Sequence, residues 1–169
     1  GLAALGLVLA VALALVLPSS RESADAHHTV GDLPSKGAFA RVLGVTFVAA
    51  MAMSLSWTYI VPLFTRVAGL PQSALPLLFA LGGAVAVAAT AASTRMLARR
   101  PVHSVALSIL GLLVAFGVLA FGAGWSAIAF QVMQAASWAV LVAALLNWAM
   151  RHTPWRTEMG AGAYTVVFN

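Results

Sequence analysis

The hydrophobic pattern of this chain consists of long uncharged runs separated by short segments that contain arginine. Residues 2–17, 42–65, 67–94 and 101–150 include no Asp, Glu, Lys or Arg. A helix needs about 20 apolar residues to cross the hydrocarbon core of a bilayer. The first run therefore predicts one slightly short transmembrane helix, the second and third runs predict one helix each, and the last run predicts two. We predict an all-α fold, a polytopic bundle of transmembrane helices.

The charged and turn-forming residues between the runs set the expected boundaries. We expect a transmembrane helix at 1–17, a linker at 18–41, and a partial bundle over 42–169 with helices near 42–65, 73–97, 102–122 and 126–150. The uncharged segment 159–169 is too short to span a bilayer and predicts the start of another helix. With about five and a half helices, the chain is expected to be an internal piece of a larger, transporter-sized protein.

The basic residues predict the orientation of the helices. The junctions after the five spans hold, in order, Arg21, Lys36 and Arg41; Arg66; Arg95, Arg99 and Arg100; no basic residue; and Arg151 and Arg156. Cytoplasmic loops of membrane proteins are enriched in Lys and Arg. The segments 18–41, 95–101 and 151–158 are therefore predicted to be cytoplasmic, in a multi-pass protein of a bacterial inner membrane.

Composition agrees with a membrane location. The mean hydropathy is +0.99 and only 8% of the residues are charged, too few for the surface of a soluble domain of this length. The net charge of +5 could favour nucleic acid, but the basic residues lie at helix boundaries and are not grouped with aromatic side chains. We expect membrane lipid as a partner and no nucleic acid. The absence of cysteine excludes disulfides and thiolate chemistry.

The linker offers the one candidate for a metal site. His27 and His28 stand beside Asp25 and Asp32, and imidazole and carboxylate groups are common metal ligands. Neighbouring side chains in a flexible segment do not converge on one ion, so we predict no metal site and no cofactor. The spans contain no carboxylate pair, no Ser/His/Asp set and no phosphate loop, and the chain is not expected to be an enzyme.

Small residues in the fourth span indicate helix packing. Ser104, Ser108, Gly111 and Ala115 recur three or four residues apart, which places them on one helix face. Small side chains allow the backbones of membrane helices to approach closely. We predict a close helix contact on this face.

Polar residues in the second span leave two interpretations open. Ser54, Thr58 and Pro62 are four residues apart on one face, and Tyr59 follows Thr58. The hydroxyl groups either bond back to carbonyls of their own helix or line a cavity. Pro62 removes the hydrogen bond to the Thr58 carbonyl, so we expect a kink there.

The fifth span carries a sharper signal in Gln131, Gln134 and Trp138, which are three and four residues apart on one face. A primary amide has two donors and an acceptor to satisfy, and lipid offers a partner for none of them. These side chains must face a neighbouring helix or a water-filled path. We predict a substrate cavity lined by Ser54, Thr58, Tyr59, Gln131, Gln134 and Trp138.

Three motifs, in this order, carry a family resemblance: Thr58, Tyr59, Ile60, Pro62 and Leu63 with Thr65, Val67, Gly69 and Leu70; Arg95, Met96, Leu97, Ala98, Arg99, Arg100 and Pro101; and Pro154 with Ala163, Phe168 and Asn169. The chain resembles the C-terminal half of a major facilitator superfamily transporter, of the drug:proton antiporter type close to arabinose-efflux-like permeases. The resemblance runs from the end of family helix six to the start of helix eleven.

The resemblance implies two six-helix bundles that move about a central path lined by helices seven, eight, ten and eleven. It implies efflux of a small molecule, coupling to protons through carboxylates in a missing N-terminal half, and a cytoplasmic gating loop at Arg95, Arg99 and Arg100. The chain departs from the family pattern at Ala98, where an aspartate is usual, and at Gln134 and Ala135, where many relatives have Trp-Gly.

A non-transporting membrane scaffold, or a helical subunit that binds a partner, is the alternative function. A transporter and a scaffold are expected to surround the polar residues differently. A solvent path along Gln131, Gln134 and Tyr59 would support transport, whereas dry, fully packed amides would support a scaffold.

Overall fold

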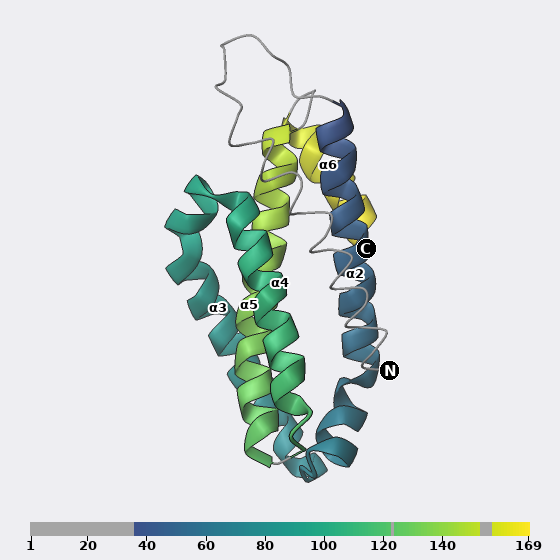
Figure 1. The fold of residues 1–169 in the computed structure, drawn as a ribbon, viewed down its shortest axis with the longest axis vertical. Helices are drawn as coiled ribbons and strands as arrows, with labels where there is room; N and C mark the ends of the chain where they lie inside the picture. Colours follow the sequence, from purple (N-terminus) through teal and green to yellow (C-terminus); the bar gives the residue numbers. More distant parts are fainter. Residues whose placement is uncertain (1–35, 123, 153–156) are drawn as a thin grey trace.

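The computed structural model describes residues 36–122, 124–152 and 157–169, which are helical apart from short connections and contain no strand (Figure 1). The elements are α2 (Lys36–Pro62), the π-helical turn η1 (Leu63–Val67), the 3₁₀ turn η2 (Gln72–Ala74), α3 (Leu75–Arg99), α4 (Pro101–Leu119), α5 (Gly124–His152) and α6 (Thr157–Phe168). Four of the helices are long and apolar enough to cross a membrane. The predicted all-α bundle is confirmed, while the predicted helix at 1–17 lies outside the described residues.

The N-terminal end of α2 differs from the sequence prediction. The helix begins at Lys36 rather than near residue 42, so the end of the segment predicted to be a linker is helical. Beyond the hydrocarbon core a helix can continue through polar residues, because its backbone hydrogen bonds are internal. Phe39, in this added part of the helix, is only 6% exposed.

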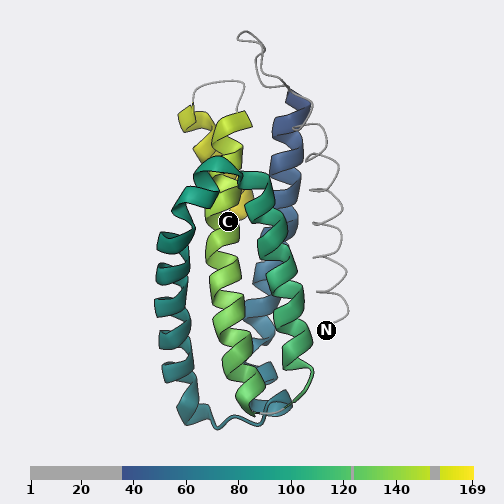
Figure 2. The same cartoon turned by 60° about the vertical axis from the view of Figure 1, so that its left-hand side comes forward.

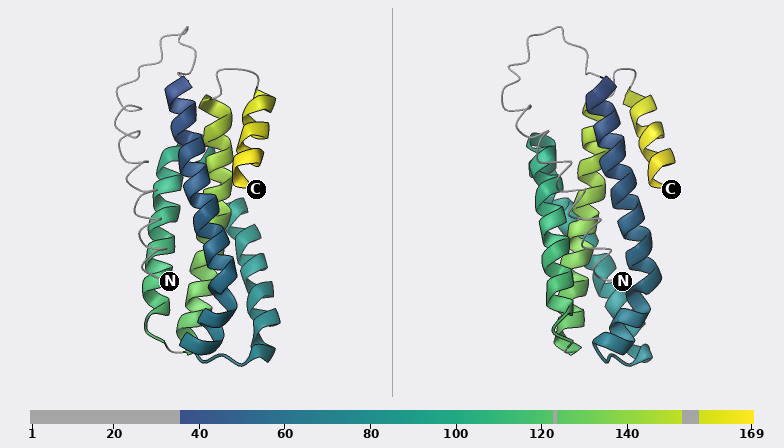
Figure 3. Two further views of the ribbon diagram at one scale, coloured as in Figure 1. Left: turned by 90° about the vertical axis from the view of Figure 1, so that its right-hand side faces the viewer. Right: turned by 45° about the vertical axis from the view of Figure 1, so that its right-hand side comes forward.

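The helix α5 lies at the centre of the bundle. It packs along α3 on one side and along α4 on another (Figures 2 and 3). Near its C-terminal end, α5 also contacts α2 and α6. From residue 129 to residue 150 every side chain of α5 is buried or half-buried, as a central helix requires, and Phe130, Leu141, Ala144 and Leu145 are at most 1% exposed. The positions of α3 and α4 are thus set by their contact with α5, whereas α2 is placed by contacts with both α5 and α6.

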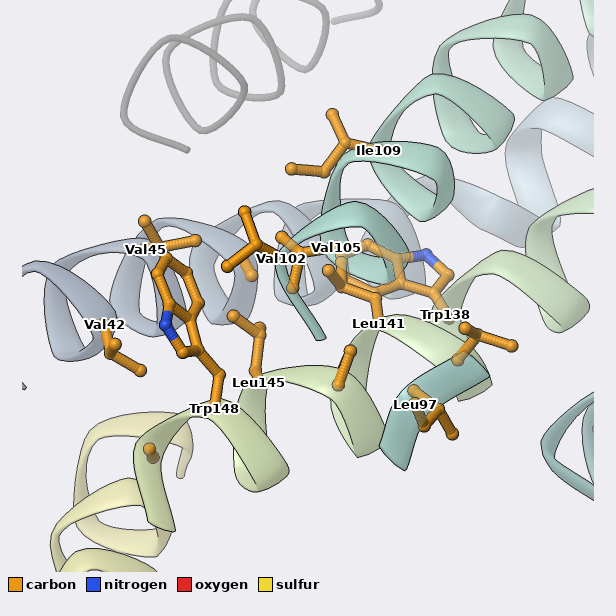
Figure 4. Close-up of a cluster of buried hydrophobic side chains, with 14 of the residues drawn as sticks. Val42, Val45, Leu97, Val102, Val105, Ile109, Trp138, Leu141, Leu145 and Trp148 are labelled. Atoms are coloured by element: carbon orange, nitrogen blue, oxygen red, sulfur yellow. The ribbon is translucent and has the colours of Figure 1, made fainter. Parts of the chain in front are cut away.

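Two clusters of apolar side chains fill the bundle. One surrounds Leu141 and Trp148 of α5, where Trp148 points toward Val45 of α2 (Figure 4). The other, nearer the opposite end, contains Phe64 and Phe130, whose rings meet edge to face with centroids 5.7 Å apart. Lipid is as apolar as these side chains, so the clusters stabilise the bundle through close van der Waals packing rather than through exclusion of water.

The small residues of α4 form the predicted packing face. Ser104, Ser108 and Ala115 are at most 4% exposed. At Gly111 a Cβ would overlap the hydroxyl oxygen of Ser137 on α5 and lie 3.4 Å from its Cβ. Glycine at this position leaves room for the Ser137 hydroxyl where α4 approaches α5, and the prediction of a close helix contact is confirmed.

The helical geometry of α2 changes directly after Pro62, where the sequence predicts a kink. The next turn is π-helical, and the N–H of Ala68 donates to the carbonyl of Leu63 over 3.1 Å. Gly69 then adopts a φ of 68°, a conformation that glycine takes without strain, and the chain turns toward α3. Proline supplies no N–H to the Thr58 carbonyl, so the regular ladder is already interrupted in the turn before η1.

Candidate functional site

The basic residues of the described helices gather at one end of the bundle. The spans are antiparallel, so the starts of α2 and α4 and the ends of α3 and α5 lie together (Figures 1 and 2). This end carries Lys36, Arg41, Arg95, Arg99, Arg100 and Arg151, whereas Arg66 is at the opposite end. In the helical part of the chain that the structure describes, the charge asymmetry follows the positive-inside pattern.

The three polar residues of α5 are buried within the bundle. Gln131 and Gln134 are each 4% exposed, and Trp138 is 6% exposed. Their spacing places them on one side of the central helix, which is turned toward the neighbouring helices. Their depth in a membrane-spanning segment makes any unsatisfied polar atom among them costly.

Gln131 lies directly against Gly82 of α3. A Cβ on Gly82 would overlap the amide nitrogen of Gln131 and would lie 3.0 Å from its Cδ atom. Glycine thus provides the space that the amide occupies. The other end of the amide, Oε1 of Gln131, is buried and has no hydrogen-bond partner. The contact brings α3 and α5 close together but leaves one acceptor unpaired.

Trp138 presents a second unpaired group two helical turns further along. Its ring belongs to the apolar cluster that includes Val105 and Ile109 of α4 and Leu97 of α3 (Figure 4). The indole nitrogen Nε1 is buried and has no hydrogen-bond partner. A buried donor or acceptor without a partner costs about 1–3 kcal/mol, so these two atoms disfavour this packing of the helices.

The polar residues predicted on α2 lie apart from those on α5. Ser54, Thr58 and Tyr59 are exposed, and Tyr59 is 54% exposed. The Thr58 hydroxyl donates to the carbonyl of Ser54 over 2.8 Å, as the back-bonding interpretation expects. The six residues of the predicted cavity therefore form two groups, one on an open face of α2 and one inside the bundle, and the structure does not bring them into one contact.

The end of α3 is held by side chains of α5. Asn147 donates from Nδ2 to the carbonyl of Leu97 over 2.7 Å, and Nη2 of Arg151 donates to the carbonyl of Ala98. Nε of Arg151 also donates to Oδ1 of Asn147 over 3.3 Å, which ties the two side chains together. We call this arrangement the α3–α5 latch. It satisfies carbonyls that a helix C-terminus leaves without an internal partner.

The latch contains a residue that the sequence analysis did not single out. Asn147 stands one helical turn before Arg151, and an amide near the end of an apolar span is the signal that could have identified it. The arginines of the predicted gating loop, Arg95, Arg99 and Arg100, are exposed beside the latch. Ala98, next to Arg99, contributes its main-chain carbonyl to the latch.

These observations define a polytopic helical membrane protein with buried polar groups on its central helix. No known family model matches the chain, and neither a curated protein nor a solved structure matches it. Across the described residues, no three His, Asp or Glu side chains come together as metal ligands. His27 and His28 lie outside the described residues.

Proposed function

We propose that the chain is part of a secondary transporter that exports a small molecule by alternating access. The observation that carries this proposal is the pair of unpaired polar atoms, Gln131 Oε1 and Trp138 Nε1, on the central membrane-spanning helix. A helix that serves packing alone gains nothing from groups that cost free energy when buried. Groups of this kind are expected where a polar substrate or water replaces the packed contact during transport.

The open face of α2 supports the same proposal. Ser54, Thr58 and Tyr59 lie there among exposed apolar side chains such as Phe47 and Met51. A face that mixes polar and apolar side chains suits contact with a second bundle across a substrate path. In the transporter family that the chain resembles, this second bundle is the N-terminal half. Residues 36–152 contain no carboxylate, so protons would be coupled by acidic residues elsewhere in the protein.

A membrane scaffold remains the second candidate, and one observation favours it. Gln131 and Gln134 are both 96% buried, as dry packed amides would be. In a transporter this packing represents one of two states, and the amides gain partners in the other. In a scaffold the packing is permanent. The two functions therefore differ in what happens when the amides are removed.

The test is export by the full-length protein in proteoliposomes, with a panel of fluorescent dyes and antibiotics as substrates. Gln131→Leu and Gln134→Leu should each lower the export rate at least about tenfold, equivalent to about 1.4 kcal/mol of lost interaction. Gln72→Leu is the matched control, because Gln72 is an exposed amide in η2, before the start of α3. Normal export by both buried variants, or no export of any panel member by the unaltered protein, would contradict the proposal.

A further inference from the structure

A compact group of arginines lies where α3 meets α4. Arg95 and Arg99 are one helical turn apart near the end of α3, and Arg100 forms the corner before Pro101. All three side chains are exposed. We call them the arginine patch. Residues 36–152 contain no Asp or Glu, and within the described residues the one acidic position is Glu158, near the start of α6. The patch therefore carries positive charge that the carboxylates of these helices do not balance.

Helix carbonyls do not balance this charge either. Basic side chains near a helix C-terminus commonly interact with its last carbonyl groups. In α3 the carbonyl of Met96 accepts from the N–H of Arg100 over 2.8 Å, and those of Leu97 and Ala98 accept from the latch. Three carbonyls of the last turn of α3 thus accept from donors other than the patch, and the guanidinium groups of the patch are available to an external anion.

The position of the patch indicates which anion reaches it. It lies at the end of α3, a helix long and apolar enough to span a bilayer, and so at the level of the lipid headgroups. The bundle covers only 17% of the apolar part of α3, against 33–44% for the other three spans. The described bundle therefore leaves most of α3 uncovered, and a lipid headgroup at this level has access to its end.

We propose that the arginine patch binds the phosphate group of anionic phospholipids. The guanidinium group of arginine presents parallel N–H donors that match two phosphate oxygens. Attraction to an anionic membrane surface is worth roughly fivefold in affinity for each arginine near it. This inference does not depend on transport and holds equally for a scaffold.

The experiment measures lipid binding by native mass spectrometry of the purified full-length protein in detergent. Phosphatidylglycerol should remain bound in preference to phosphatidylcholine, and its affinity should fall as salt concentration rises. Arg95→Gln, Arg99→Gln and Arg100→Gln, made separately so that the other basic residues still direct insertion, should each weaken phosphatidylglycerol binding about two- to fivefold. Arg66→Gln, at the opposite end of the bundle, is the matched control and should leave the affinity unchanged.

Three results would overturn the inference. The first is equal affinity for the two lipids. The second is phosphatidylglycerol binding that none of the three patch variants weakens, or that Arg66→Gln weakens to the same degree. The third is displacement of phosphatidylglycerol by an equal concentration of inorganic phosphate, which would show a site for the free anion rather than for a lipid. Melting temperature and oligomeric state, recorded for every variant, confirm that the compared proteins are folded.

Discussion

The side-chain amide of Gln131 on α5 occupies the space that a side chain on Gly82 of α3 would fill. The two residues are far apart in sequence, and the contact lies within the apolar part of both helices. The Gln131 side chain thus packs closely against α3 and also carries an unpaired acceptor, because its Oε1 has no hydrogen-bond partner. The stability of the α3–α5 interface and the availability of the polar group are therefore linked at this point.

Gly82→Ala should destabilise the protein because the new Cβ forces the Gln131 amide out of its position. Overpacking of this kind costs about 1–3 kcal/mol, reduced here because the end of a glutamine side chain can move. Gly83→Ala is the matched control: a Cβ there meets nothing within 4 Å. Thermal unfolding in detergent should show a lower melting temperature for Gly82→Ala alone. Adding Gln131→Ala should recover part of the loss; an additive effect would contradict the contact.

Gln131→Met tests whether the amide is really unpaired. Methionine is similar in length and removes the unpaired acceptor, so the free energy of unfolding should change by less than about 1 kcal/mol or increase. A paired amide would instead leave its partner unsatisfied and lower stability by about 1–3 kcal/mol. Denaturation of the two proteins under identical conditions distinguishes these results.

Gly111→Ala should weaken the contact between α4 and α5. The added methyl group would overlap the hydroxyl of Ser137, and its Cβ would lie 3.4 Å away. We expect a loss of up to about 1–3 kcal/mol, reduced because the hydroxyl can rotate to another position. Gly117→Ala on the same helix has open space and should be neutral or stabilising. Combining Gly111→Ala with Ser137→Gly should restore stability. If both alanine variants melt alike, the close approach is not as described.

Asn147→Ala should loosen the end of α3 without unfolding the bundle. The variant leaves the Leu97 carbonyl without its donor and removes the acceptor that holds Nε of Arg151. The expected cost is about 1–2 kcal/mol. Hydrogen exchange should accelerate in the last turn of α3, while the middle of α5 stays protected. Arg99→Ala, an exposed residue outside the latch, serves as the control and should leave exchange unchanged.

The orientation of the bundle can be tested directly, because the chain has no native cysteine. Gln72→Cys and Gly124→Cys should react with an impermeant thiol reagent added outside intact cells. Ser23→Cys and Thr157→Cys should react only after the membrane is opened, because the positive-inside pattern places them in the cytoplasm. Labelling of Thr157→Cys in intact cells would reverse the assignment.

The sequence predicted the four described spans because each is a long uncharged run with basic residues at alternate junctions. The predicted ends of the helices were less accurate. The helix α2 starts earlier than predicted, because a helix can extend past the apolar run that identifies it. The burial of Gln131 and Gln134 followed from the cost of exposing amides to lipid. Which helix covers them did not follow, because the pairing of Gly82 with Gln131 depends on the packing of distant segments.

The latch shows the same limit more clearly. Leu97 and Asn147 are 50 positions apart, and the acceptor is a main-chain carbonyl that every residue possesses. No side-chain pattern marks such a carbonyl as a partner. The separation of the α2 and α5 polar groups also could not be read from the chain, since helix periodicity gives the face of a residue but not the direction in which that face points.

The central position of α5 has a consequence for the order of folding. The spans α2, α3 and α4 leave the ribosome first. Yet α3 and α4 find their main partner in α5, and α2 packs mainly against α6 and α5, which are all made later. Until residues 124–152 are synthesised, the earlier helices have no common surface on which to assemble. The nascent protein must therefore wait in the membrane as separate or loosely joined helices, and the bundle closes in one late step when α5 arrives between them.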